Sequence, residues 1–369
     1  MKILVLSSHT KSLFWYRMDM MQAFVKSGYK VFAAGPDEER VWKDKFKEYN
    51  IEYFHISVLR TGINPLEDLK TFKSIKTLMQ NIEPDKVFVY QAKTIVYGCL
   101  AANNCHIGEV YPMVAGLGSI FRSSGLKNML ARPIMYLLYK LAFGFSKKVF
   151  FQNEDDKQFL LKRKILSSNK IVLINGTGVN LGRFKPTPLP SQITFLFIGR
   201  LLKDKGIKEY LSACEIIKNK YPSVRCLLVG PYDTNPSAIK PKDLKTYTEK
   251  NIVEYFGEQF DVRPYIEQCT TFVLPSYHEG TPKTVLEAMA MGRAIITTDA
   301  PGCRETVKNG INGLLVKVKD VKDLVDKMEY VILNPEMNIK FGKNSFELAK
   351  EKYDVNKINY KIMSTMNLA

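Results

Sequence analysis

The sequence predicts an α/β protein with two doubly wound domains, each built around a parallel sheet. Apolar runs of strand length alternate with helix-length segments through both halves of the 369-residue chain, a pattern typical of βαβ units. The chain is also too long for one domain of ordinary size. A Gly- and Pro-rich segment interrupts the alternation, which then restarts, so we place a linker at residues 185–192.

The expected strands are short apolar runs, and each domain has its own set. They cover residues 2–6, 29–34, 51–56, 86–90, 109–114, 148–152 and 171–174 in the first half, and 194–198, 225–229, 252–256, 271–274 and 294–297 in the second. We expect an N-terminal domain over 1–186 and a C-terminal domain over 187–345. The last segment, 346–369, ends a helical stretch over 338–366 and is expected to pack back on the first domain.

Composition and charge exclude some classes of protein and leave others open. Apolar residues make up 46% of the chain, no run approaches the roughly 18 apolar residues of a membrane span, and the first apolar run is too short for a signal peptide. The six cysteines are scattered, so we expect reduced thiols in a cytoplasmic protein. The net charge is +17, and residues 1–186 hold 28 Lys and Arg against 15 Asp and Glu. Such an excess attracts nucleic acid, anionic lipid or a phosphorylated substrate.

The densest chemical signal follows the strand expected at 271–274. A helix is expected to begin near Pro282, and its first N–H groups and positive end suit an anion such as a diphosphate. Gly280 lets the backbone approach a ligand closely. Glu279 and Glu287 bracket the helix start and are placed to accept hydrogen bonds from sugar hydroxyls. The pair alone is equally compatible with a helix-dipole acid and a surface glutamate.

Cations come from the loop after the strand expected at 194–198. Arg200 and Lys205 lie at the carboxyl end of that strand, where open α/β sheets bind ligands. Arginine offers a two-pronged phosphate contact and lysine a mobile point charge. Taken alone, such a loop is more often a solvated surface.

Together these motifs resemble the family-4 glycosyltransferases of GT-B fold, which have two Rossmann-like domains facing a central cleft. The resemblance covers nearly all of residues 172–330 in the expected order. The matching residues are Gly199-Arg200, Lys205-Gly206, Leu228-Val229-Gly230, Phe256-Gly257, Leu274-Pro275-Ser276, Glu279-Gly280-x-Pro282 with Leu286-Glu287-Ala288-Met289-Ala290 and Gly292, Pro301-Gly302-Cys303-x-Glu305, and Asn309-Gly310 with Gly313-Leu314-Leu315-Val316.

The resemblance implies a role for each donor-site residue. Glu279 would face the transferred sugar and Glu287 the ribose, while Arg200 and Lys205 would hold the diphosphate as the catalytic cations. Backbone near Phe256 would meet the base. The remaining donor-binding candidates lie on the same helix start: Gly280, Thr281, Lys283, Thr284 and Leu286.

The resemblance also implies retention of configuration without a metal ion or other cofactor. It implies a nucleotide sugar as substrate and favours uridine as the base, which no single residue specifies. The chain lacks the Asp-x-Asp sequence of metal-dependent glycosyltransferases, and Glu154-Asp155-Asp156 is better interpreted as a helix start. The expected chemistry is front-face attack, with cations stabilising the departing diphosphate. No pair of carboxylates suited to double displacement is recognisable.

Acceptor-side candidates are fewer, because the first half departs from the family pattern. Its first loop lacks the paired glycines of many relatives, and Gln91-Ala92-Lys93 stands where relatives often have a histidine. His9 and Lys93 are candidates, with a surface or capping role as the alternative. Gly116, Gly118 and Arg122 belong to a Gly-Leu-Gly loop similar to that of bacterial enzymes that extend undecaprenyl-diphosphate-linked glycans, such as the N-acetylgalactosaminyl- and galactosyltransferases of O-antigen and protein-glycan assembly.

Apolar residues between basic ones over 126–145 suit a helix lying on an anionic membrane, kinked or restarted at Pro133; a core helix with a basic outer face is the alternative. The sequence therefore predicts a hexosyl- or N-acetylhexosaminyltransferase, peripheral on the inner face of the plasma membrane, acting on a lipid-linked saccharide. The alternatives are a GT-B enzyme with a soluble acceptor, such as an epimerase or glucan synthase, and a basic nucleic-acid-binding protein. The last lacks any recognisable nucleic-acid module.

Overall fold

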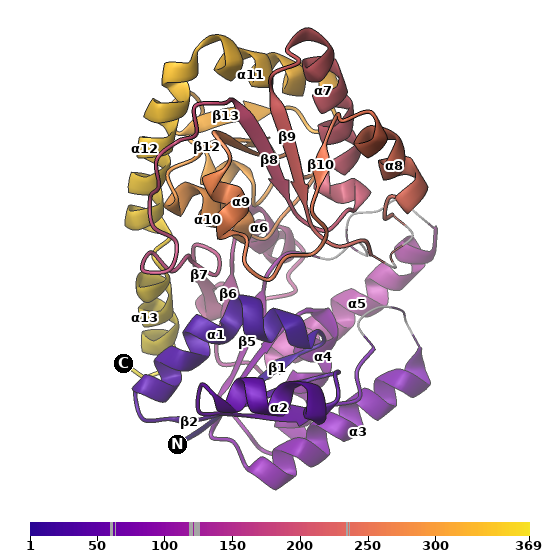
Figure 1. Ribbon diagram of the computed structural model, residues 1–369. Helices are drawn as coiled ribbons and strands as arrows, with labels where there is room; N and C mark the ends of the chain where they lie inside the picture. Colours follow the sequence, from indigo (N-terminus) through magenta and orange to yellow (C-terminus); the bar gives the residue numbers. More distant parts are fainter. Residues whose placement is uncertain (60–61, 63, 118–120, 122–125, 234, 236) are drawn as a thin grey trace. The chain divides into compact units, whose positions relative to one another are not determined.

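The computed structural model describes residues 1–59, 62, 64–117, 121, 126–233, 235 and 237–369, with the backbone alone at 126–128. Contacts between residues divide the chain into two units, each of α/β type (Figure 1). Unit 1 comprises residues 1–177 together with 355–369, and unit 2 comprises residues 178–354. Unit 1 therefore contains both ends of the chain.

Among the described residues, unit 1 holds a seven-stranded parallel sheet in the order β3-β2-β1-β4-β5-β6-β7. Its strands are β1 (Lys2–Ser7), β2 (Lys30–Gly35), β3 (Ile51–His55), β4 (Lys86–Tyr90), β5 (Val110–Val114), β6 (Val149–Phe151) and β7 (Ile171–Leu173). The order reverses direction between β1 and β4, and such a switch point is where open α/β sheets form ligand crevices.

Helices cover both faces of this sheet (Figure 1). One face packs against α3 (Pro65–Ile82), α4 (Ala92–Asn104), α5 (Leu126–Gly144) and α6 (Glu154–Lys162). The other packs against α1 (Thr10–Lys26), α2 (Glu39–Lys47) and the C-terminal helix α13 (Val355–Thr365). Because both faces are buried, the central strands are apolar except at their ends, where Lys2, Ser7 and Lys86 lie.

Unit 2 has a six-stranded parallel sheet in the order β10-β9-β8-β11-β12-β13, counted over the residues described. The strands are β8 (Thr194–Ile198), β9 (Arg225–Val229), β10 (Glu254–Tyr255), β11 (Thr271–Leu274), β12 (Ala294–Thr298) and β13 (Gly313–Val316). The helices are α7 (Ile207–Lys220), α8 (Pro241–Glu249), α9 (Arg263–Glu267), α10 (Lys283–Ala290), α11 (Val321–Leu333) and α12 (Pro335–Lys352).

Some expected elements differ from the observed ones. The helical stretch expected at 338–366 is divided into α12 and α13, because Val179 pairs with Asp354 and its N–H donates to the Tyr353 carbonyl at 2.8 Å. Strand β10 is only two residues long. Helix α5 continues through Pro133 without restarting, and Pro282 precedes α10 as its N-cap residue instead of lying inside it.

Within the described residues, no helix is both long enough and apolar enough to cross a bilayer.

Candidate active site in the C-terminal unit

The predicted donor-site residues of unit 2 lie at the carboxyl ends of its strands, on loops and in the first turns of α10. The loop after β11 carries Glu279 and leads into α10, and the loop after β8 carries Arg200 and Lys205. The two loops touch through their backbones: the Tyr277 N–H donates to the Asp204 carbonyl at 2.9 Å. At Gly206, where φ is +73°, a Cβ atom would lie 2.1 Å from the Pro275 carbonyl oxygen. Glycine is therefore required for this approach.

Glu279 sits in a network of polar contacts. Lys205 Nζ lies 2.5 Å from Glu279 Oε1, and Ser276 Oγ donates to the same oxygen at 2.8 Å. Both contacts orient the carboxylate from one side. The neighbouring Cys303 is a neutral thiol, because burial and then the Glu279 charge raise its pKa to about 12.

The backbone at Glu279 is equally constrained. Its N–H donates to the Pro301 carbonyl at 2.9 Å. A Cβ atom on Gly302, whose φ is +81°, would lie 2.1 Å from the Glu279 carbonyl oxygen. The Pro301-Gly302 turn therefore supports the Glu279 loop from behind, which gives a physical reason for a glycine at this position.

Glu287 lies one turn into α10 and is nearly buried, with 7% exposure. Lys283 Nζ is 3.9 Å from its Oε1 atom. Thr284 Oγ1 donates to the Ile198 carbonyl at 3.2 Å and ties α10 to the end of β8. Thr281 Oγ1 donates to the Gly280 carbonyl at 3.0 Å. Leu286 is fully buried in the core of unit 2, so its side chain offers no surface to a ligand.

Arg200 has a partner that sequence reasoning missed. Arg200 Nη1 lies 2.8 Å from Oδ2 of Asp233, a residue in the loop between β9 and α8. Ser276, in the Leu274-Pro275-Ser276 motif, is a second functional residue to which the sequence alone assigns no role. A hydroxyl directly after a buried strand that leads to a charged loop is a signal that marks Ser276, whereas nothing in the local sequence pairs Asp233 with Arg200.

Phe256 follows β10 at the edge of the same sheet. Its carbonyl accepts a hydrogen bond from Gln259 Nε2 at 2.6 Å, and its ring lies 4.9 Å from the ring of Tyr265. The Gly230 N–H donates to the Gly257 carbonyl at 2.8 Å, which holds the ends of β9 and β10 together. Phe256 and Arg200 thus both follow strands at the carboxyl-end edge of the unit 2 sheet.

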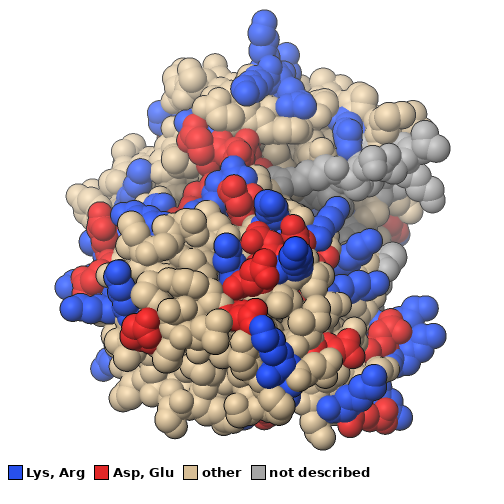
Figure 2. Space-filling view, turned by 90° about the horizontal axis from the view of Figure 1, so that it is seen from above, with Lys and Arg blue, Asp and Glu red and all other residues tan. Residues whose placement is uncertain are grey.

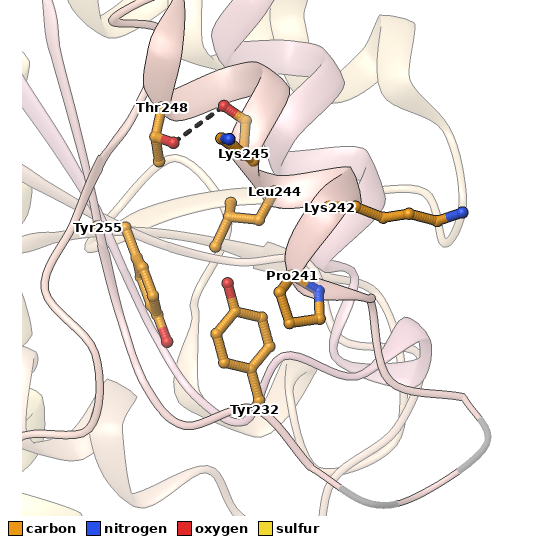
Figure 3. A pocket seen from close by; sticks show the side chains of 7 residues that line it. All are labelled: Tyr232, Pro241, Lys242, Leu244, Lys245, Thr248 and Tyr255. Atoms are coloured by element: carbon orange, nitrogen blue, oxygen red, sulfur yellow. Dashed lines mark hydrogen bonds between the residues drawn. The ribbon is translucent and has the colours of Figure 1, made fainter.

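A cavity of about 430 Å³ lies beside this edge, between α8, β10 and the loop after β9 (Figure 3). The rings of Tyr232 and Tyr255 meet there edge to face, with centroids 5.6 Å apart and planes at 71°, and Leu244 also lines the cavity. Lys242 points away from the rings. The lining includes neither of the predicted catalytic cations.

On the face shown in Figure 2, basic and acidic side chains are interspersed instead of separated by sign.

The acceptor-side candidates lie in unit 1. His9 precedes α1 as its N-cap residue. Lys93, in the first turn of α4, is 2.6 Å from Asp68 Oδ1 with both side chains 13% exposed, so its charge is already neutralised. Gly116 has a φ of +124°. Gly118 and Arg122 lie outside the described residues.

Gln91, noted in the sequence only as a departure, organises the loop after β1. Its Oε1 atom accepts hydrogen bonds from the hydroxyls of Ser7 and Ser8 at 2.9 and 2.8 Å, and Nε2 donates to Ser12 Oγ at 3.2 Å. Its φ is +73°, a conformation that costs a non-glycine residue energy and persists only where neighbours enforce it. These contacts lie at the switch point between β1 and β4.

Comparison with known proteins identifies the class. The family model described as glycosyl transferases group 1 matches residues 182–348, and that described as glycosyl transferase 4-like matches residues 2–153. The N,N'-diacetylbacillosaminyl-diphospho-undecaprenol alpha-1,3-N-acetylgalactosaminyltransferase of Campylobacter jejuni is 32% identical over 96% of each chain. This chain therefore belongs to the family-4 glycosyltransferases, and the prediction of an enzyme is confirmed.

More distant relatives and solved structures agree. The UDP-Gal:alpha-D-GlcNAc-diphosphoundecaprenol alpha-1,3-galactosyltransferase of Escherichia coli is 25% identical over 79% of this chain and 77% of its own. Sucrose-phosphate synthase from Thermosynechococcus elongatus superposes with a TM-score of 0.81 at 17% identity, covering 99% of this chain and 98% of its own. HepE of Anabaena, solved with UDP, superposes with a TM-score of 0.79 at 17% identity over the whole of both chains. The predicted GT-B fold is thus confirmed.

Proposed function

We propose that this glycosyltransferase moves a hexose or N-acetylhexosamine from a UDP-sugar to a polyprenyl-diphosphate-linked saccharide, with retention and without a metal ion. The observation that carries the proposal is the contact of Lys205 with Glu279 at the tip of α10, with Arg200 on the same loop as Lys205. The carboxyl-end edge of the unit 2 sheet thus carries cations, a helix N-terminus and carboxylates that can accept hydrogen bonds from sugar hydroxyls. That combination suits a sugar diphosphate.

In the proposed reaction the bond between the anomeric carbon and the diphosphate oxygen breaks, and its electron pair leaves with the phosphate. Arg200, Lys205 and the α10 N–H groups stabilise that charge, which removes the need for a metal ion. The acceptor hydroxyl attacks the same face of the sugar and forms the new bond to the anomeric carbon. Its proton passes to the departing diphosphate oxygen, so that charge and atoms balance. Loss of one such stabilising group typically slows turnover by about 10²–10³.

The acceptor assignment draws on the relatives, because the Campylobacter and Escherichia enzymes both carry names with undecaprenyl-diphosphate-linked substrates. Helix α5 adds a physical argument. Its exposed apolar residues recur every three or four positions and form one stripe, which continues just past the helix end: Leu130, Ile134, Leu137, Leu141 and Phe145. Arg132, Lys140 and Lys147 occur along the same stretch. An apolar stripe among basic residues suits an anionic membrane surface, where a lipid-linked acceptor resides.

A donor and acceptor screen tests the proposal. We expect UDP release from UDP-galactose, UDP-glucose or their N-acetylamino forms when a short-chain polyprenyl-diphosphate N-acetylhexosamine is present, and none from GDP-mannose. Activity should persist in EDTA, and proton NMR should show that the product keeps the donor's α configuration. Arg200→Ala should lower kcat by at least about 100-fold. Turnover that requires a divalent ion, inversion at the anomeric carbon, or full activity of Arg200→Ala would each contradict the mechanism.

A further inference from the structure

Every cation of the donor site has a carboxylate as its neighbour. The three pairs are Arg200 with Asp233 at 2.8 Å, Lys205 with Glu279 at 2.5 Å, and Lys283 with Glu287 at 3.9 Å. In the proposed function Glu279 and Glu287 contact hydroxyl groups of the donor. Asp233 has no such role, and the family motifs in the sequence do not include it.

Asp233 is held firmly in place. Its side chain is 15% exposed, and Oδ1 accepts a hydrogen bond from the Asn235 N–H at 2.8 Å. Its loop is fastened to the segment after β8, because the Leu201 N–H donates to the Pro231 carbonyl at 3.1 Å and the Lys203 N–H to the Ser237 carbonyl at 2.9 Å. These contacts hold the carboxylate beside Arg200, where an anion that reaches Arg200 would meet it.

A diphosphate bound to Arg200 would thus share the guanidinium with a fixed negative charge. Arginine has five N–H donors, so both partners can be accommodated geometrically. The like charges of Asp233 and the phosphate still repel each other. Solvent and salt weaken this repulsion, because the Arg200 side chain is 38% exposed, but they do not abolish it at such short range.

The repulsion differs between donor and product. In a UDP-sugar the diphosphate is esterified at both ends and carries two negative charges. Departure of the sugar leaves a terminal phosphate whose second ionisation has a pKa near 6, so free UDP carries close to three negative charges at neutral pH. A fixed carboxylate beside the diphosphate therefore disfavours the product more than the substrate.

From this asymmetry, and resting on the proposed donor class, we infer that Asp233 is a positioning residue that promotes release of the nucleoside diphosphate through its contact with Arg200. The Asp233 carboxylate partly offsets the positive charge of Arg200, which the reaction requires. Without it, the cations that stabilise the leaving group would also retain that group after transfer.

The test is Asp233→Asn, which keeps the shape and a hydrogen-bond acceptor for Arg200 but removes the charge. We expect the inhibition constant of UDP against the donor to fall about two- to fivefold, the range for partly exposed charge interactions, while the donor KM falls less than twofold. UDP affinity by calorimetry should change in parallel.

Glu254→Gln is the matched control. Glu254 pairs with Arg225 at 2.7 Å, in the same unit, but Arg225 begins β9 and so lies at the opposite end of the strand from Asp233. This variant should leave UDP affinity unchanged. UDP inhibition that is unchanged or weaker in Asp233→Asn, or equal shifts in KM and the inhibition constant, would overturn the inference. A wild-type protein that binds a different nucleoside diphosphate would instead contradict the proposed donor, and the same comparison would then be made with that nucleotide.

Discussion

At the scale of single residues, the orientation of Glu279 distinguishes a working site from a simple cluster of charges. A lone glutamate in a loop samples several rotamers, and fixing a long side chain loses conformational entropy when a substrate binds. Here two donors, Lys205 Nζ and Ser276 Oγ, converge on one carboxylate oxygen. The folded loop therefore already restricts the Glu279 side chain, so little further conformational entropy is lost when the sugar binds.

Replacing Ser276 with alanine tests this orientation. Ser276 is fully buried, and its hydroxyl donates one hydrogen bond to an ionised group, which is worth about 1.5–3 kcal/mol. We expect kcat to fall roughly tenfold or more, with little change in donor KM, because the bond positions the carboxylate for the reacting sugar. Steady-state kinetics and the melting temperature measured together separate this effect from destabilisation. An unchanged kcat in a folded variant would refute the positioning role.

At the scale of elements, α5 has two faces with different environments. Tyr139, Ala142 and Phe143 are buried against the sheet of unit 1, whereas Leu130 is 74% and Leu137 58% exposed. The sequence left two readings open for this helix, a membrane-surface helix and a core helix with a basic outer face. One side of α5 is buried and its outer side is apolar instead of purely basic. This arrangement is compatible with a helix on a membrane surface, which remains a prediction.

Vesicle flotation measures this prediction directly. The wild-type protein should bind vesicles that contain anionic phosphatidylglycerol at low salt, and less at high salt. Ile134→Ser combined with Leu137→Ser should weaken binding at least about tenfold, since each removes exposed apolar area that would enter the membrane interface. Binding that survives the double substitution would argue against α5 as the contact.

Two exposed aliphatic residues of unit 2 supply the control for that experiment. Leu333 and Ile339 are 63% and 66% exposed, close to the values for the α5 pair. Leu333→Ser with Ile339→Ser removes a similar amount of apolar surface elsewhere on the chain. Unchanged vesicle binding in this variant would localise the effect to α5.

At the scale of the whole molecule, unit 1 is completed by the far end of the chain. Helix α13 packs on α1 and buries apolar residues in the same core as β1 and β2. The residues concerned are Ile358, Ile362, Met363, Met366 and Leu368. Each buried side chain of this kind contributes about 1.5–3 kcal/mol.

A chain ending at Asp354 should therefore lose unit 1 as a stable body. We expect the unfolding transition of unit 1 to disappear or to fall below ambient temperature in calorimetry, while residues 178–354 remain resistant to limited proteolysis. Tyr360→Ala on the exposed side of α13, where the side chain is 67% accessible, should change the melting temperature little. Two transitions unaltered by the truncation would show that α13 is dispensable.

The sequence predicts elements that depend on local hydropathy better than elements that depend on contacts between distant residues. A continuous apolar run predicts most buried strands to within a residue or two, and β8, β9 and β11 match in full, but the short strand β13 (Gly313–Val316) is not among the strands predicted from the sequence. β10 was overestimated, because only Glu254 and Tyr255 pair with β9 at the sheet edge, and pairing leaves no trace in local hydropathy. The break before α13 arises from a bridge to Val179, far away in sequence.

The candidate site divides in the same way. Motif residues such as Lys205 and Glu279 can be proposed from sequence because they follow buried strands, and the carboxyl ends of parallel strands meet at one edge of a sheet. The loops after β8 and β9 are brought together in the same way, but no motif specifies that Asp233 is the residue whose carboxylate contacts Arg200. The left-handed backbone at Gln91 is equally hidden, because glutamine has no intrinsic preference for it.

The placement of α13 also bears on how the polypeptide matures during translation. Domains generally fold as they emerge from the ribosome, beginning with the N-terminal one. In this protein residues 1–177 share their unit with residues 355–369, whereas residues 178–354 form a unit of their own. We therefore expect the part of α1 that α13 covers to stay exposed in the nascent chain until residues 355–369 have been synthesised.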